Sequence, residues 1–152
     1  MGERYLKSIR LLAECMQGFE RFSGDFVRPY GLTHAQFDII ATLGNTAGMS
    51  YKELGEKTLI TKGTLTGVIE RLEQKNLVER VRSTDDKRSW LVRLTSSGEQ
   101  AFAQVFPHIT AQGKKLFAHF SDADFAALEQ SLSGLKQAIT TSPLSRIKKE
   151  KI

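Results

Sequence analysis

The stretch that decides the fold is residues 50–95, SYKELGEKTLITKGTLTGVIERLEQKNLVERVRSTDDKRSWLVRLT. It reads as a helix, a short turn, a second helix, and then two β-rich runs on either side of the polar turn Thr84–Arg88. The first helix is expected to point Leu54 inward. The second helix opens on the largely polar sequence ITKGTLT and buries its other side through Leu65, Ile69 and Leu72. A short helix of this kind, supported by a neighbouring helix, enters a DNA major groove, and a basic hairpin beside it reaches the minor groove. The stretch therefore predicts a DNA-binding winged helix.

The composition is that of a folded, water-soluble chain of 152 residues, of which 40% are hydrophobic and 26% are charged. No apolar run is long enough for a transmembrane helix, and the N-terminal letters MGER lack the apolar segment of a secretion signal. The single cysteine excludes an internal disulfide, as is typical of proteins in the reducing cytoplasm. We therefore expect a cytoplasmic protein.

The net charge of +5 is distributed unevenly along the chain. Residues 61–93, which hold the second helix and the hairpin, have a surplus of three positive charges, and residues 1–60 are neutral. The last ten residues form a basic tail with a further surplus of three. Positive charge that gathers on the helix and hairpin favours an anionic partner such as double-stranded DNA.

Three long amphipathic stretches flank the central segment, at residues 5–28, 96–120 and 121–140. Pro107 predicts a kink or a local break in the middle one, because proline removes a backbone donor. Ser121, with Asp124 three residues later, is expected to cap the last stretch. Apolar residues recur every three or four positions along the first and last stretches. They are Tyr5, Ile9, Leu12, Met16 and Phe19 in the first, and Phe125, Leu128, Leu132, Leu135 and Ile139 in the last.

These faces carry more apolar surface than a small winged-helix core can cover, so we predict a C2 homodimer. Such a dimer places two recognition helices one DNA turn apart, which matches a palindromic site. The expected fold class is mainly α with a small β-hairpin wing. Residues 1–30 and 96–142 form the helical dimerisation region, 31–95 the winged helix-turn-helix domain and 143–152 the basic tail.

The chain resembles the MarR family of bacterial transcription regulators from about Leu6 to Ile139. The resemblance implies a helical dimerisation region joined to a winged-helix DNA reader, usually a repressor relieved by a small ligand or an oxidant. Gly67 departs from the family pattern, which more often has a large polar or basic residue there. Asn76 is expected to end the second helix as a glycine would. The motifs that carry the resemblance are Leu32–Phe37, Thr61–Thr66, Arg71–Glu73 with Asn76 after it, Asp86–Arg88 and Leu94–Gly98.

The candidate DNA-binding residues lie on the second helix, at the start of the helix before it, and on the hairpin. Ser50 could donate to a phosphate from the start of its helix, where it also begins a capping box with Glu53. Thr61 could instead only cap its helix, and Arg71 could instead pair with Glu70 or Glu73. The full set is Ser50, Thr61, Lys62, Thr64, Thr66, Arg71, Arg82, Lys87 and Arg88, with Asp86 in support of Arg88.

An electrostatic argument independently predicts that the hairpin tip binds DNA. An arginine there, such as Arg88, can enter a narrow minor groove, where the electrostatic potential is most negative. Asp86, two residues earlier, can hold that guanidinium by charge-assisted hydrogen bonds. The resemblance implies the same roles for this pair. The alternative is that the acidic and basic letters DDKR only make a soluble turn.

An effector site is a further expectation that the resemblance implies, between the first, second and fifth helices. His34, with Arg21 or Arg28 nearby and with Phe37, could receive an aromatic carboxylate or another small anion. The alternative is that His34 is only a polar residue at a helix start. Cys15 raises a redox-sensing alternative, but its place on the apolar face of the first helix predicts a buried, inert thiol.

Other function classes find no support in the sequence. His34, His108 and His119 lack metal-ligand spacing, so we expect no metal and no cofactor. The sequence shows no nucleophile–base arrangement and no glycine-rich phosphate loop, so we do not expect an enzyme. A winged helix used only for protein contacts would more often expose aromatic residues in place of this basic face.

Overall fold

The structure is a computed structural model that describes residues 2–58, 60–86 and 88–146. The chain divides into two compact units, residues 1–111 and 112–152. The predicted helical dimerisation region has parts in both units, and the predicted domain boundaries stay a prediction. Each unit is described by itself below.

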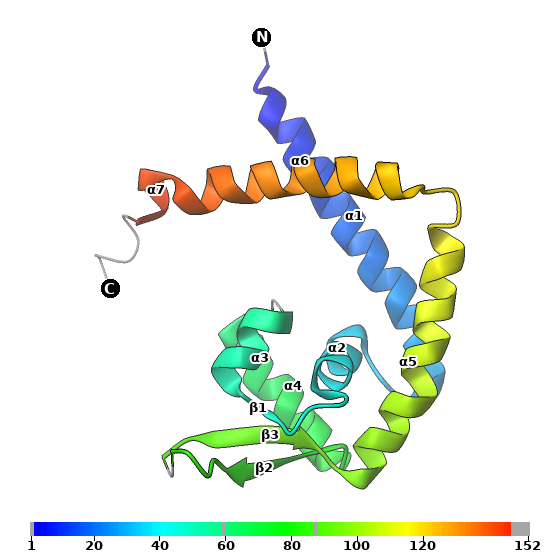
Figure 1. The fold of residues 1–152 in the computed structure, drawn as a ribbon, viewed down its shortest axis with the longest axis vertical. Helices are drawn as coiled ribbons and strands as arrows, with labels where there is room; N and C mark the ends of the chain where they lie inside the picture. Colours follow the sequence, from blue (N-terminus) through cyan, green and yellow to red (C-terminus); the bar gives the residue numbers. More distant parts are fainter. Residues whose placement is uncertain (1, 59, 87, 147–152) are drawn as a thin grey trace. The chain divides into compact units, whose positions relative to one another are not determined.

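The first unit holds most of the helices and the whole sheet (Figure 1). Its helices α2, α3 and α4 pack together over one face of the small sheet (Figure 1). In chain order the elements are α1 (Arg4–Val27), the 3₁₀ turn η1 (Arg28–Tyr30), α2 (His34–Leu43), β1 (Met49–Ser50), α3 (Tyr51–Thr58), α4 (Lys62–Gln74), β2 (Val78–Arg82), β3 (Trp90–Leu94) and α5 (Ser96–Leu116), which continues into the second unit.

Local sequence signals place the ends of these helices. Thr33 and Gln36 form a reciprocal capping box at the start of α2, after a turn that Gly31 completes in the left-handed region at φ 75°. Asn76 takes the same backbone region at φ 58°, directly after α4. The expectation that Asn76 ends the helix as a glycine would is therefore confirmed.

The sheet is antiparallel, with strand order β1-β3-β2. The predicted hairpin is confirmed, and its register pairs Val78 with Leu94 and Arg82 with Trp90. The third strand, β1, was not predicted, because two residues are too few to show an alternating pattern. Gly98 packs against the hairpin so closely that a Cβ there would lie 2.0 Å from the Leu77 carbonyl oxygen.

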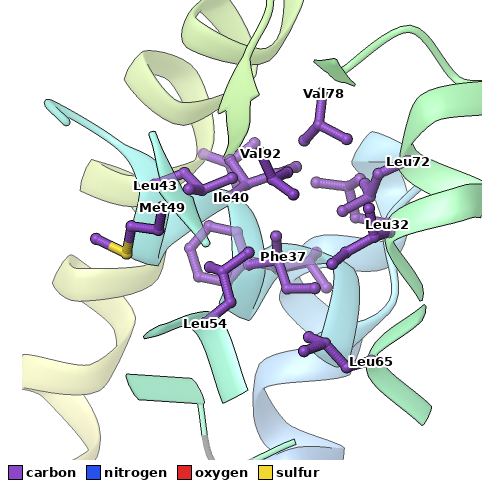
Figure 2. Packing of buried hydrophobic residues seen from close by; sticks show 14 residues of the cluster. Leu32, Phe37, Ile40, Leu43, Met49, Leu54, Leu65, Leu72, Val78 and Val92 are labelled. Atoms are coloured by element: carbon purple, nitrogen blue, oxygen red, sulfur yellow. The ribbon is translucent and has the colours of Figure 1, made fainter. Parts of the chain in front are cut away.

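The hydrophobic core lies between α2, α3, α4 and the sheet (Figure 2). Leu54, Leu65, Ile69 and Leu72, all predicted to point inward, are buried there. The strands contribute Val78 and Val92, while α1 and α5 contribute Val27 and Val105. This core fixes how α4 and the hairpin sit within one unit.

The second unit contains the end of α5, α6 (Asp122–Thr141) and α7 (Pro143–Arg146). The predicted cap of α6 is confirmed: the Asp124 N–H donates to the Ser121 hydroxyl (3.1 Å), and the Ser121 N–H donates back to the Asp124 carboxylate (2.9 Å). These hydrogen bonds with Ser121 hold the pKa of Asp124 below its ordinary value. Leu128, Leu132 and Ile139 remain exposed on α6, Ile139 to 54%.

One expectation about the outer elements was wrong in part: Pro107 does not break its helix, because α5 runs without interruption from Ser96 to Leu116. The predicted basic tail begins with the short helix α7, and residues 147–152 lie outside the described residues, so the tail stays a prediction. In the part of the chain that the structure describes, no helix is both long enough and apolar enough to span a membrane.

Candidate nucleic-acid interface

The N-terminal turn of α4 is exposed and polar. Thr61 holds the N-cap position, and its carbonyl oxygen accepts from the Thr64 and Leu65 N–H groups at 3.0 and 2.8 Å. Its hydroxyl donates to the Thr64 hydroxyl (3.1 Å) and caps no backbone amide, so the side-chain cap expected for Thr61 is wrong. The helix therefore presents its positive dipole end and its threonine hydroxyls to solvent.

The remaining candidates on α4 are exposed as well. Lys62, Thr64, Thr66 and Arg71 all face solvent, while Leu65 lies in the core beneath them. Arg71 forms no ion pair with any described residue, so the expected pairing with a neighbouring glutamate is not observed. Lys62 and Arg71 are thus available as cations at the two ends of α4.

Ser50 sits where β1 meets α3 and is already engaged. Its hydroxyl accepts from the Glu53 N–H (3.1 Å) and lies 3.2 Å from the Glu53 carboxylate, which confirms the predicted capping box. The Ser50 hydroxyl would have to release that carboxylate before it could donate to a phosphate. The Ser50 contact with DNA therefore stays a prediction.

The tip of the hairpin is organised by hydrogen bonds to Asp86. One carboxylate oxygen accepts from the Arg88 backbone N–H and the other from the Ser89 hydroxyl, each at 3.0 Å. The Ser83 N–H donates to the Ser89 carbonyl (2.9 Å) and closes the base of the turn. Beyond the last strand pair, the Asp86 side chain therefore supplies acceptors for the turn where backbone hydrogen bonds between the strands have ended.

This geometry corrects the predicted role of Asp86. Among the described residues, no ion pair or hydrogen bond joins the Asp86 carboxylate to the Arg88 guanidinium. Asp86 instead fixes the Arg88 backbone, and Arg88 is exposed. Lys87, the neighbouring candidate, lies outside the described residues.

Trp90, at the base of the wing, was not among the predicted site residues. The Arg82 guanidinium carbon lies 4.4 Å from the centroid of the indole, and that of Arg80 lies 5.9 Å from it. The Arg80 Nε is also 3.1 and 3.2 Å from the two oxygens of Glu73 on α4. Glu73 raises the pKa of Arg80 above its ordinary value, and a hydrogen bond to the Tyr51 hydroxyl adds to the effect.

A signal for this cluster was present in the sequence. Arg80 and Arg82 are two apart and so share a face of β2, and a hairpin centred on Asp86 pairs Arg82 with Trp90. A cavity of about 440 Å³ lies beside the cluster, lined by Glu73, Val78, Glu79, Arg80 and Trp90. The link from Arg80 to Glu73 had no such signal, because it joins a strand to a helix.

The predicted effector residues are not brought together as a set. Phe37 is buried in the hydrophobic core beside Leu54 (Figure 2). Arg28 pairs with Asp25 (3.1 Å) and Arg21 is exposed; neither arginine bonds to His34 among the described residues.

His34 does have an aromatic environment. The Phe19 ring meets its imidazole edge-on at 6.3 Å between centroids, and its Nδ1 is buried without a hydrogen-bond partner among the described residues. Burial raises the pKa of Asp38, one turn along α2, while the nearby His34 acts in the opposite direction.

Cys15 is exposed in the single chain. The expectation of a buried thiol on the apolar face of α1 is therefore wrong for one protomer. Met16, on the same helix and on the stripe expected to meet a second copy, is 49% exposed.

Comparison with known proteins identifies relatives of this arrangement. Residues 32–90 match the model of the MarR family. The HTH-type transcriptional regulator SarZ of Staphylococcus epidermidis is 33% identical over 75 residues, which are 49% of this chain and 51% of SarZ. The match thus spans about half the length of that curated relative.

Solved structures extend the likeness over most of the chain. A mutant MarR from E. coli in complex with operator DNA is 28% identical, with a TM-score of 0.68 over 83% of this chain and 91% of that one. AbsC, a MarR family transcriptional regulator from Streptomyces coelicolor, has a TM-score of 0.79 at 23% identity, over 93% of this chain and 98% of AbsC. The second likeness shows the fold alone.

Proposed function

We propose that the chain is a member of the MarR family and a sequence-specific regulator of transcription that binds double-stranded DNA. One observation carries the proposal: a solvent-exposed recognition helix with Lys62 and Thr64 at its start belongs to the same unit as an ordered wing tip that exposes Arg88. The related E. coli MarR was crystallised with its operator DNA. The chain is accordingly a regulator and not an enzyme.

We propose that Lys62 and Arg71 contact phosphates, that Thr61, Thr64 and Thr66 reach base edges or phosphates, and that Arg88 enters the minor groove. The hydroxyl groups lie on the exposed turn of α4, where partly positive backbone amides also favour an anion. Ser50, Arg82 and Lys87 complete the proposed contact set from the flanking segments.

The protein acts as a homodimer on a palindromic operator. Support comes from the apolar side chains left exposed on the outer helices, among them Tyr5 and Ile9 on α1 and Leu132 and Ile139 on α6. Their exposure in one protomer is what an isologous interface would remove. Sedimentation at micromolar concentration should give twice the 17.0 kDa mass, and Leu132→Glu should shift the distribution toward monomer. A stable monomer of the unaltered protein would refute this part.

Repression relieved by a small aromatic or anionic effector is the proposed mode of control. The buried, unpaired Nδ1 of His34 beside Phe19 supports a polar contact in an aromatic setting. A His34→Ala variant should bind operator DNA normally and fail to release it with the effector. Oxidation at the exposed Cys15 is the alternative, and a Cys15→Ser variant that loses release by peroxide would favour it.

The decisive experiment is selection of bound duplex fragments from the protein's own genome, followed by titration of the best fragment at increasing salt. We expect log Kd to depend linearly on log salt, with a slope of about 0.9 for each neutralised phosphate. Selection of a two-fold symmetric sequence would support both dimer and operator. No enrichment of any duplex, or an affinity that is flat with salt, would favour the alternative of a winged helix used only for protein contacts.

A further inference from the structure

The wing is tied to the recognition helix by one continuous set of contacts. Glu73, on the last turns of α4, holds the Arg80 guanidinium on β2 at 3.1 Å. Tyr51, at the start of α3, adds to the effect of Glu73 in raising the pKa of Arg80.

Trp90 extends this set of contacts toward the tip. Arg80 and Arg82 lie on one face of β2, and Trp90 pairs with Arg82 across the hairpin. Both guanidinium carbons lie within 6 Å of the indole centroid, Arg82 the closer at 4.4 Å. That distance is the range of a cation–π interaction, for which tryptophan is the strongest partner. The indole thus restrains the arginine nearest the tip.

Restraint of Arg82 matters because a flexible arginine side chain loses rotamer entropy when it is fixed. An arginine that is already stacked loses less of this freedom when it meets a phosphate. Trp90 itself is 42% exposed, so it adds little to the core. The contact between the indole and the Arg82 guanidinium explains why a tryptophan occupies this exposed position.

We infer that Trp90 is a positioning residue of the DNA-binding wing, whose indole holds Arg82 in the orientation that binds the DNA backbone and connects it through Arg80 to the recognition helix. The inference rests on the function proposed above. It adds Trp90, Arg80 and Glu73 to the residues on which DNA affinity depends, although none of them needs to touch DNA.

The first test needs no DNA, because Trp90 is the only tryptophan of the chain and reports its own surroundings. Arg82→Ala should expose the indole, shift its emission to longer wavelength and increase its quenching by acrylamide. The matched control is Arg93→Ala, which removes one positive charge from the opposite face of the same hairpin, where Arg93 pairs with Glu79 at 2.7 Å. Equal quenching in the wild type and both variants would overturn the inference.

The second test measures affinity for the selected duplex. Trp90→Ala should weaken binding by about two- to fivefold for each half-site, the range expected of an exposed cation–π pair, and Trp90→Phe should recover part of the loss. In an Arg82→Ala background, Trp90→Ala should cost nothing more, because its effect acts through Arg82. Additive losses would indicate a merely structural role and overturn the inference.

The possible outcomes distinguish a failure of the inference about Trp90 from a failure of the proposed DNA-binding function. Wild-type protein without affinity for any duplex would refute the proposed function together with the inference. Normal DNA binding by wild type and by Trp90→Ala would refute the inference alone. A Trp90→Ala variant that fails to fold leaves the Arg82 and Arg93 variants, in which the indole is unaltered, to decide the question.

Discussion

Replacement of Asp86 distinguishes two ways in which this residue could serve the wing. Its carboxylate accepts from the Arg88 N–H and the Ser89 hydroxyl, and within the described part of the chain it makes no ion pair with the Arg88 guanidinium. Asp86→Ala removes both acceptors. Asp86→Asn can keep both hydrogen bonds, one of them with its direction reversed, because the amide oxygen can accept from the Arg88 N–H and the amide nitrogen can donate to the Ser89 hydroxyl.

The size of the effect follows from the two lost hydrogen bonds. Each contributes about 0.5–1.5 kcal/mol net, and both are exposed, so their joint loss is about 1–2 kcal/mol. That free energy corresponds to a fall of roughly 5- to 30-fold in the ordered population of the turn. Asp86→Ala should therefore weaken operator binding by at most that factor in each half-site. Arg88→Ala should weaken it further, since it removes the contacting group itself.

Fluorescence anisotropy on the selected duplex measures the affinities, and NMR hydrogen exchange at the Arg88 amide reports the order of the turn. We expect Asp86→Ala to accelerate that exchange and Asp86→Asn to leave both exchange and affinity near wild type. Arg88→Ala should change the global stability by less than about 0.5 kcal/mol. The reasoning is refuted if Asp86→Asn binds as weakly as Asp86→Ala, because the charge of Asp86 would then be what matters.

Three further predictions test other parts of the structure. Lys62→Ala should reduce the slope of log Kd against log salt by about 0.9 for each half-site, measured by anisotropy. Gly67→Ala should raise the stability to urea by about 0.5–1 kcal/mol, because a Cβ there meets nothing within 4 Å, whereas Gly98→Ala should lower it, because its Cβ would lie 2.0 Å from a backbone oxygen. Burial raises the pKa of Asp38 above 3.8, so the folded chain binds the Asp38 proton more tightly than the unfolded chain does. The folded state therefore loses stability as the pH rises from 3.8 through the raised pKa. Asp38→Asn should melt at a higher temperature than wild type at pH 7 and lose that advantage below pH 3.8.

Local patterns in the sequence were sufficient for most of the fold. The inward positions Leu54, Leu65 and Leu72 followed from helical spacing, and all three are buried in the core. The caps at Ser50 and Ser121 followed from a hydroxyl residue with an acid three positions later. Each of these signals is complete within a few residues, so no knowledge of the tertiary structure was needed.

The roles assigned to individual side chains at the interface were less predictable. Asp86 was expected to hold the Arg88 guanidinium, yet its carboxylate accepts from the Arg88 backbone N–H and the Ser89 hydroxyl, which are local donors within the turn. Thr61 was expected to cap α4, but its hydroxyl bonds to Thr64 instead. For each residue, the expected and the observed hydrogen bond are compatible with the same sequence. Only the backbone and side-chain torsions of the folded turn decide which of the two forms.

The periodicity of apolar residues likewise does not determine whether an apolar face is buried within one chain. Met16 and Leu132 lie on amphipathic helices whose patterns predict burial, and both are exposed in the single chain. Helical periodicity states which residues share a face, and it does not state whether that face is covered by the same chain or by another. The exposed Cys15 follows the same rule. A second copy that covers this face would bury the thiol, so the oxidation rate of Cys15 should fall as protein concentration rises through the dimer dissociation constant.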